Sequence, residues 1–115
     1  MHQVVLGLGG NRGDKLALLD KASQLLAQKM DLEKASSIYH TAAWGGNSHG
    51  AYLNQVLVLR TSMKAEECLN FIQQIENQLG RKRGVKWGDR TMDIDILYFD
   101  NEIINTERLK VPHPH

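Results

Sequence analysis

The chain contains 115 residues, of which 42% are hydrophobic and 23% are charged, and its formal net charge is +1 at pH 7. This length predicts one domain, residues 1–115, that can bury a core of its own. A charge so close to neutral argues against a nucleic-acid or membrane partner, and a single cysteine, Cys68, excludes an internal disulfide and a thiolate metal cluster. The sequence shows no signal-peptide pattern and no membrane-length apolar run, so the expected location is cytoplasmic.

The N-terminal part of the sequence predicts a strand and then a helix. Residues 4–8 form a short apolar run, and the glycine-rich residues 9–13 end it with turn chemistry. Asp14 is a suitable N-cap, so the helix is expected to run from there to about residue 30. Its apolar stripe is expected to contain Leu16, Leu19, Leu26 and Met30.

The middle of the chain predicts two strands and a second helix. The first strand lies near residues 35–39, and residues 44–50 follow it as a loop. Residues 52–61 alternate, with one face made of Leu53, Leu57 and Leu59 and the other of Tyr52, Asn54, Val56 and Val58. The helix spans about residues 65–79 and ends at Gly80, with a poor cap, Lys64, before it. Its buried stripe is expected to contain Cys68, Ile72, Ile75 and Leu79.

The last part of the chain predicts a strand that ends at Phe99, a turn at residues 100–101, and short edge strands at 102–105 and 109–111. The order β-α-β-β-α-β is typical of the split-βαβ, ferredoxin-like fold. We therefore expect an α+β domain with an antiparallel sheet, both helices packed on one face, and the other face open to ligands. Because many unrelated functions use this fold, it does not decide the function.

An acidic pair stands out in the last long strand. Asp93 and Asp95 alternate with the apolar residues Met92, Ile94 and Ile96. In a strand, alternate side chains point to opposite faces, so both carboxylates would share one face, with their Cα atoms roughly 7 Å apart. Oxygen ligands at such a spacing suit Mg²⁺, which binds one or two carboxylates together with water and substrate phosphates.

A basic segment leads directly into this strand. Five of the ten residues from 81 to 90 are lysine or arginine, and Gly80, Gly84 and Gly88 favour a mobile loop. Cations for phosphate beside carboxylates for metal suit a metal–nucleotide site. Each element alone has a plain alternative, a solvated basic loop or two surface aspartates. Their adjacency in the chain favours the metal–phosphate interpretation.

Several short motifs occur together along nearly the whole chain. The most specific is residues 87–96, which run from Trp87 through the acidic pair to Ile96, with valine, proline and histidine downstream at 111–113. The others, in chain order, are Gly10-Asn11, residues 52–54, Gln73 with Glu76, Gly80-Arg81 and residues 105–109. In this set the sequence resembles the 6-hydroxymethyl-7,8-dihydropterin pyrophosphokinase family of the folate pathway.

The resemblance implies an ATP-dependent transferase that moves the β,γ-diphosphate of ATP onto the hydroxymethyl group of the dihydropterin and leaves AMP. It implies that Asp93 and Asp95 hold two Mg²⁺ ions and that Asp95 also helps to deprotonate the hydroxyl. Arg81 and Arg90 would grip the transferred phosphates. ATP and 6-hydroxymethyl-7,8-dihydropterin are therefore the expected partners, and the chain is expected to be a monomer.

Further positions match binding residues of the family. The resemblance implies an ATP site lined by Gln73, Glu76, Arg83, Trp87, Ile96, Arg108 and His113, with Arg83 and Trp87 on a mobile catalytic loop. It implies a pterin pocket lined by Thr41, Tyr52 and Asn54. Plain alternatives exist for some of these: ordinary strand packing for Tyr52, a solvated helix face for Gln73 and Glu76, and a mobile end for residues 113–115.

The sequence departs from the family pattern at two loops and at its end. Residues 41–44 read Thr-Ala-Ala-Trp where relatives usually have Thr-Pro-Pro, and residues 9–11 read Gly-Gly-Asn where Gly-Ser-Asn is common. Relatives usually continue past the Val-Pro-His segment with an arginine, a second pterin-stacking aromatic and a closing helix. A second stacking group and one phosphate cation are then missing, unless Trp44 or a neighbouring chain substitutes, so reduced activity is expected. Without the closing helix, uncovered apolar sheet surface would favour self-association or reduced stability over a stable monomer.

Two functional hypotheses stay open at this point. The first is the enzyme, whose catalytic residues Asp93, Asp95, Arg81 and Arg90 are all present. The second is a non-catalytic nucleotide- or pterin-binding relative, or an incomplete copy with impaired activity. A ferredoxin-like RNA binder is disfavoured, because carboxylates on the open face would repel a phosphate backbone.

Overall fold

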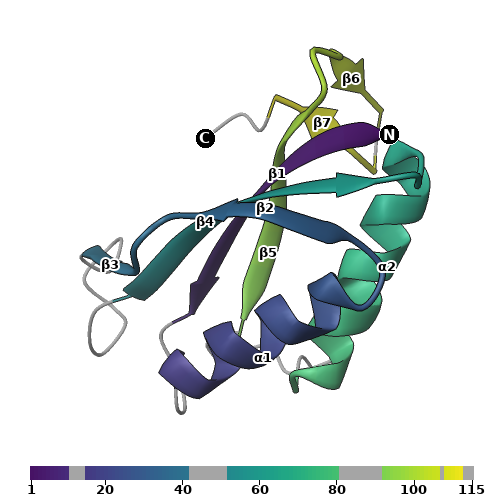
Figure 1. Ribbon diagram of the computed structural model, residues 1–115. Helices are drawn as coiled ribbons and strands as arrows, with labels where there is room; N and C mark the ends of the chain where they lie inside the picture. Colours follow the sequence, from purple (N-terminus) through teal and green to yellow (C-terminus); the bar gives the residue numbers. More distant parts are fainter. Residues whose placement is uncertain (11–14, 42–51, 81–91, 107, 113–115) are drawn as a thin grey trace.

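The computed structural model describes residues 1–10, 15–41, 52–80, 92–106 and 108–112, and of Tyr52 it describes the main chain. The predicted turn at residues 9–13 and the Asp14 cap fall largely outside these ranges, as does the predicted loop at 44–50. Figure 1 shows the arrangement of the described elements, with both helices on the same side of a twisted sheet. The predicted α+β, ferredoxin-like arrangement is confirmed.

The main sheet is antiparallel throughout its described pairs, in the order β2-β4-β1-β5, with β3 also paired to β4. The strands are β1 (His2–Gly10), β2 (Asp31–Ala35), β3 (Tyr39–Thr41), β4 (Tyr52–Thr61) and β5 (Asp93–Phe99). Strand β1 therefore lies in the middle, with β4 on one side and β5 on the other. Residues on β4 and β5 that are far apart in sequence meet across it.

One face of the sheet and both helices build the core. The helices are α1 (Lys15–Ala27) and α2 (Ala65–Gln78), and neither is long and apolar enough to cross a membrane. Alternate residues of the strands point toward them and are buried, namely Val4, Leu6, Leu8, Leu53, Leu57, Leu59, Ile94 and Ile96. The helices contribute Leu19, Ala22, Leu26, Cys68, Ile72 and Ile75. Leu16 was predicted in this stripe, but its side chain is 59% exposed because it lies in the first turn of α1, away from the sheet.

The predicted strand at residues 35–39 is wrong in its bounds. The structure has β2 ending at Ala35 and β3 beginning at Tyr39, with Ser36 between them. The hydroxyl of Ser36 accepts the backbone N–H of Val56 at 2.9 Å, and its own N–H donates to the Val56 carbonyl at 2.8 Å. This side-chain contact interrupts regular pairing. All residues of β2 are exposed, so no apolar alternation marked it in the sequence.

Strand β5 carries a bulge at Leu97. Leu6 pairs with Ile96, whereas Val5 pairs with Tyr98, so the register shifts by one residue between them. Without the bulge, Tyr98 would point to the same face as Ile94 and Ile96 and would be buried. With the bulge, Phe99 is buried instead and Tyr98 is 54% exposed.

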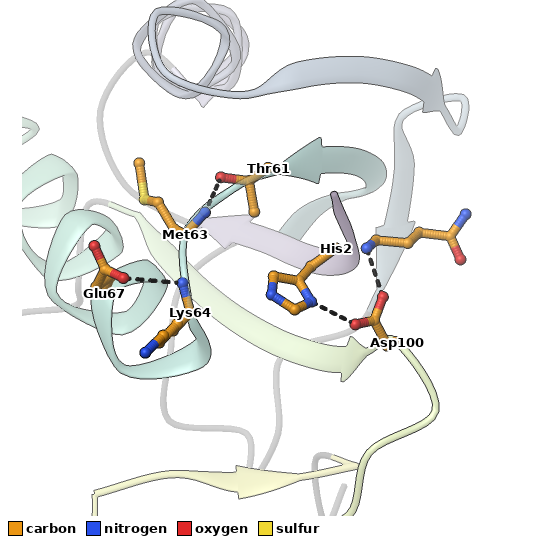
Figure 2. Close-up of polar contacts among 7 residues, drawn as sticks. His2, Thr61, Met63, Lys64, Glu67 and Asp100 are labelled. Atoms are coloured by element: carbon orange, nitrogen blue, oxygen red, sulfur yellow. Dashed lines mark hydrogen bonds and ion pairs between the residues drawn. The ribbon is translucent and has the colours of Figure 1, made fainter.

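Helix α2 agrees closely with the prediction, including its buried stripe. At its start, the Glu67 carboxylate accepts the Lys64 backbone N–H at 3.1 Å, the bond that the third helical residue makes in a capping box (Figure 2). At its end, Gly80 has a φ of 103°, a conformation that glycine adopts without strain. Burial, with a smaller contribution from the nearby Glu67 charge, raises the pKa of the Cys68 thiol to about 11, consistent with a core residue.

The two short C-terminal strands were predicted as edge strands. They are β6 (Ile104–Asn105) and β7 (Lys110–Val111), and they pair with each other rather than with the main sheet. The connection is closed by Thr106, whose N–H donates to the Leu109 carbonyl at 2.8 Å. Leu109 and Val111 are buried, so this small sheet is attached to the main core.

Asp100 ties the turn after β5 to the first residues of β1. Its carboxylate accepts the Gln3 backbone N–H and contacts the His2 ring, each at 2.7 Å. Figure 2 shows the contact between Asp100 and His2. Its φ of 50° is one that aspartate and asparagine tolerate. The Gln3 N–H first, and the His2 contact second, hold the pKa of the Asp100 carboxyl below its usual value.

This lowered pKa predicts a pH-dependent contribution to stability. A group with a depressed folded-state pKa stabilises the fold above its unfolded pKa, about 3.9, and loses that contribution as the pH falls through the folded pKa. We expect Asp100→Asn, which keeps the turn conformation and removes the charge, to lower the free energy of unfolding at pH 7. Urea denaturation should show the difference from wild type shrinking below about pH 4. A difference that is constant from pH 7 to pH 3 would contradict this assignment.

Candidate functional site

The face of the sheet opposite the helices carries the acidic pair. On β5, Ile94 and Ile96 are buried toward the helices, while Asp93 is half-buried and Asp95 is exposed on the other face. Met92, just before the strand, is fully buried with them. The structure thus places both carboxylates on one face, as the alternation predicts.

Two glycines of β1 lie beside these carboxylates. Gly9 pairs with Asp93 and Gly7 pairs with Asp95. On its other side, Gly9 pairs with Asn54 of β4, so Asp93, Gly9 and Asn54 form a row across three strands. The outer members are two strand spacings apart, roughly 10 Å. Since glycine has no side chain, the space over this part of β1 is left to side chains of the neighbouring strands.

No role was predicted for Gly7 and Gly9 from the sequence, although a signal was present. Glycine in a strand interior weakens the strand and often marks a place where a ligand or another chain segment approaches closely. A Cβ added at Gly9 would lie 3.0 Å from Asn54 Oδ1, and one at Gly7 would lie 3.2 Å from Leu97 Cδ1. The Asn54 amide and the bulged Leu97 therefore use the space that the absent side chains leave.

Thr41 sets the orientation of the Asn54 side chain. The Asn54 Nδ2 donates to the Thr41 hydroxyl at 2.8 Å, and Tyr39, two residues earlier on β3, pairs with Asn54. With the amide nitrogen directed to β3, the amide oxygen is directed over Gly9. Tyr52 pairs with Thr41 through its main chain, and its side chain lies outside the description. Two predicted pterin-pocket residues, Thr41 and Asn54, are thus in direct contact.

Glu76 lies behind the acidic pair, at the junction of α2 and β5. Its side chain is only 5% exposed, and its carboxylate accepts the Ile94 backbone N–H at 3.0 Å. The alternative of a solvated helix face is therefore wrong for Glu76, whereas Gln73 is exposed. Ile96, another residue matched to the ATP site, has its side chain in the core, 4% exposed.

Arg108 is held against the outer face of α2. Its guanidinium donates to Glu66 at 2.9 Å and to Asn70 at 2.7 Å. Residues three apart on a helix are neighbours, so Gln73 is the next side chain along from Asn70. The structure therefore brings Arg108 and Gln73, both predicted for the ATP site, to the same side of α2.

The remaining predicted residues lie outside the described residues. They are Arg81, Arg83, Trp87, Arg90 and His113, together with Trp44 and His115. In the sequence, residues 81–91 lie between α2 and β5, so the basic segment comes directly before the strand that carries the acidic pair. The described site thus comprises two carboxylates, two glycines without side chains of their own and an oriented amide.

Comparison with known proteins agrees with this arrangement. Residues 5–115 match the family model described as 7,8-dihydro-6-hydroxymethylpterin-pyrophosphokinase. The chain is 45% identical over 114 residues to a 2-amino-4-hydroxy-6-hydroxymethyldihydropteridine pyrophosphokinase from Aquifex aeolicus, covering 99% of this chain and 71% of the relative. It is 46% identical over 111 residues to the protein of the same name from Bacillus subtilis, covering 95% of this chain and 66% of that relative.

A cyanobacterial relative of the same name, from Synechocystis, is 37% identical over 115 residues, covering 98% of this chain and 58% of its own length. The chain thus spans about two thirds of the length of these relatives. The matches extend over almost every residue described above, and they confirm the family that the motifs indicated. The chain belongs to the 7,8-dihydro-6-hydroxymethylpterin-pyrophosphokinase family.

Proposed function

We propose that this chain transfers diphosphate from ATP to 6-hydroxymethyl-7,8-dihydropterin and releases AMP, as a step of folate biosynthesis. The observation that carries the proposal is the row of Asp93, Gly9 and Asn54 across the open face, with Asp95 two residues from Asp93 on the same strand and face. It supplies carboxylates suited to a metal and an amide suited to hydrogen bonding, on either side of a strand position that has no side chain of its own. Membership of a family named for this reaction supports the choice of substrates.

The proposed reaction makes one bond and breaks one. The hydroxymethyl oxygen of the pterin bonds to the β-phosphorus of ATP, and the bond from that phosphorus to the oxygen shared with the α-phosphate breaks. That oxygen leaves with AMP, and the hydroxyl gives up its proton. The chain must hold the hydroxyl in line with the breaking bond. Asp95, the more exposed carboxylate, is suited to orient the hydroxyl and to accept its proton.

Asp93 and Asp95 are the residues that would hold Mg²⁺. They are carboxylates on alternate residues of one strand and share a face, a donor set that fits an ion also bound by substrate phosphates. Mg²⁺ bound with ATP would neutralise charge that develops on the phosphates. Arg81 and Arg90 stay the predicted phosphate ligands, and Gln73 and Arg108 stay predicted for the nucleotide.

Asn54 is suited to the polar edge of a pterin. Its amide oxygen, directed over Gly9 by the Thr41 contact, can accept an N–H of the ring. Because Gly9 has no side chain, the Asn54 amide can lie close over the main chain of β1 and present its oxygen to the edge of the ring. Tyr52 stays the predicted stacking residue.

The direct test is AMP formation by the purified chain with ATP, Mg²⁺ and 6-hydroxymethyl-7,8-dihydropterin. We expect AMP in amounts equal to the diphosphorylated pterin, and none with a chelator or without pterin. ATP binding by a folded protein that forms no AMP would contradict the proposal and favour a nucleotide-binding relative without activity.

Replacement of Asp95 tests the acidic end of the row. We expect Asp95→Asn to lower kcat by at least about a hundredfold, on the order of 3 kcal/mol in the barrier, because proton transfer and metal binding are both lost. The fold should persist, since Asp95 is exposed rather than part of the core. The matched control is Asp31→Asn, another exposed strand aspartate, on β2, which should leave kcat unchanged. Comparable kcat values for both variants would rule out the role given to Asp95.

Gly9→Ala tests the position of the Asn54 amide over Gly9. The added Cβ would lie 3.0 Å from Asn54 Oδ1, so the amide must shift. We expect the KM for the pterin to rise roughly fivefold, on the order of 1 kcal/mol in binding, with a smaller change in the KM for ATP. Steady-state kinetics and a thermal unfolding curve would separate this effect from lost stability. A pterin KM equal to wild type would show that the amide does not contact the ring.

A further inference from the structure

We propose that Glu76 is a positioning residue, which fixes the part of β5 that carries Asp93 and Asp95 by accepting the Ile94 backbone N–H. The inference deepens the proposed function and rests on it, because it concerns the same acidic pair. It gives Glu76 a role that acts through the main chain rather than through contact with ATP.

The contact joins a buried acceptor to a buried donor. The Glu76 side chain and the Ile94 side chain are each 5% exposed, and the carboxylate oxygen lies 3.0 Å from the Ile94 nitrogen. Burial of a carboxylate is unfavourable unless hydrogen bonds compensate for lost water. A charged acceptor also makes a stronger bond to an N–H than a neutral one does.

Sheet pairing explains why Ile94 needs a partner from a helix. Within the described sheet path, β5 pairs with β1 and lies at the end of the strand order. In an antiparallel pair, successive N–H groups point alternately toward the partner strand and away from it. The N–H of Ile94, which goes to Glu76, points away from β1. Without Glu76, this buried N–H would lose its acceptor.

The bond fixes the orientation of the Asp93–Ile94 peptide group, the first of the two peptide groups that separate the acidic residues. Rotation of the Asp93–Ile94 peptide plane changes ψ of Asp93 and φ of Ile94, and so turns the Asp93 carboxylate relative to Asp95. Glu76 is itself held by α2, whose neighbouring residues Ile72 and Ile75 are 1% and 2% exposed. The acidic pair is therefore anchored to a packed helix and not only to its own strand.

Two variants separate the hydrogen bond from the volume of the side chain. Glu76→Gln keeps an acceptor oxygen for Ile94, whereas Glu76→Met keeps a similar volume without a comparable acceptor. The matched control is Gln74→Ala, an exposed position on the same helix. Three measurements apply to each: hydrogen exchange of the Ile94 amide, calorimetric binding of Mg²⁺ with α,β-methylene-ATP, and kcat with KM for the pterin.

In Glu76→Met, we expect hydrogen exchange of the Ile94 amide to accelerate by about tenfold or more. The affinity for Mg²⁺ with α,β-methylene-ATP and the kcat should each fall by about tenfold or more, as they do when other residues that orient metal ligands are replaced. The pterin KM should stay within about twofold, since Asn54 and Thr41 lie on other strands. In Glu76→Gln, the Ile94 exchange rate, the nucleotide affinity and kcat should each lie within about threefold of wild type. Gln74→Ala should match wild type in all three.

Unchanged Ile94 exchange, or unchanged nucleotide affinity and kcat, in Glu76→Met would overturn the inference. So would a Glu76→Gln variant that protects the Ile94 amide but loses activity as fully as Glu76→Met. If Glu76→Met does not fold, Glu76→Asp replaces it, because the shorter side chain withdraws the acceptor and predicts the same losses. A wild-type protein that forms no AMP would contradict the proposed function. An active wild-type protein with an unaffected Glu76→Met variant would contradict this inference alone.

Discussion

Pairing of β1 with strands on both sides is the constraint on which the rest of the structure depends. The two faces of this strand differ. Val4, Leu6 and Leu8 are buried against the helices, whereas Gly7 and Gly9 leave room on the opposite face for side chains of neighbouring strands. Because alternation in a strand is strict, a shift of one residue would move leucines onto the open face and glycines into the core. The register of β1 therefore sets both the stability of the core and the shape of the candidate site.

The site is assembled from groups that are distant in sequence but adjacent in the sheet. Asp93 and Asp95 come from β5, and Asn54 from β4 is oriented by Thr41 from β3. Glu76 adds a connection from the helical layer to the acidic end of the row. The arrangement separates the expected phosphate end from the expected pterin end by one strand. This separation suits a reaction in which a hydroxyl on one substrate must meet a phosphorus on another.

Local patterns predicted much of this fold. The alternation in β4 and β5 and the helical period of α2 are strong signals, because each follows from burial of one face. The sequence could not reveal the Leu97 bulge, which depends on pairing with β1, or the exposed strand β2, which has no apolar alternation. For the site, the acidic pair was evident, but the Glu76–Ile94 bond joins residues 18 positions apart through packing of α2 on β5. Contacts of this kind arise from tertiary structure, and no periodic pattern in the sequence predicts them.

The most direct test of the central claim is the position of the metal–nucleotide on the open face. Mn²⁺, as a paramagnetic substitute for Mg²⁺, can be added with α,β-methylene-ATP to the ¹⁵N-labelled protein. If the acidic pair holds the metal, the amide signals of Gly7, Gly9, Asp93 and Asp95 should broaden selectively while signals on β2 stay sharp. Asp95→Asn should abolish this broadening. Broadening centred elsewhere, or the same broadening in Asp95→Asn, would contradict the claim that this acidic pair holds the metal.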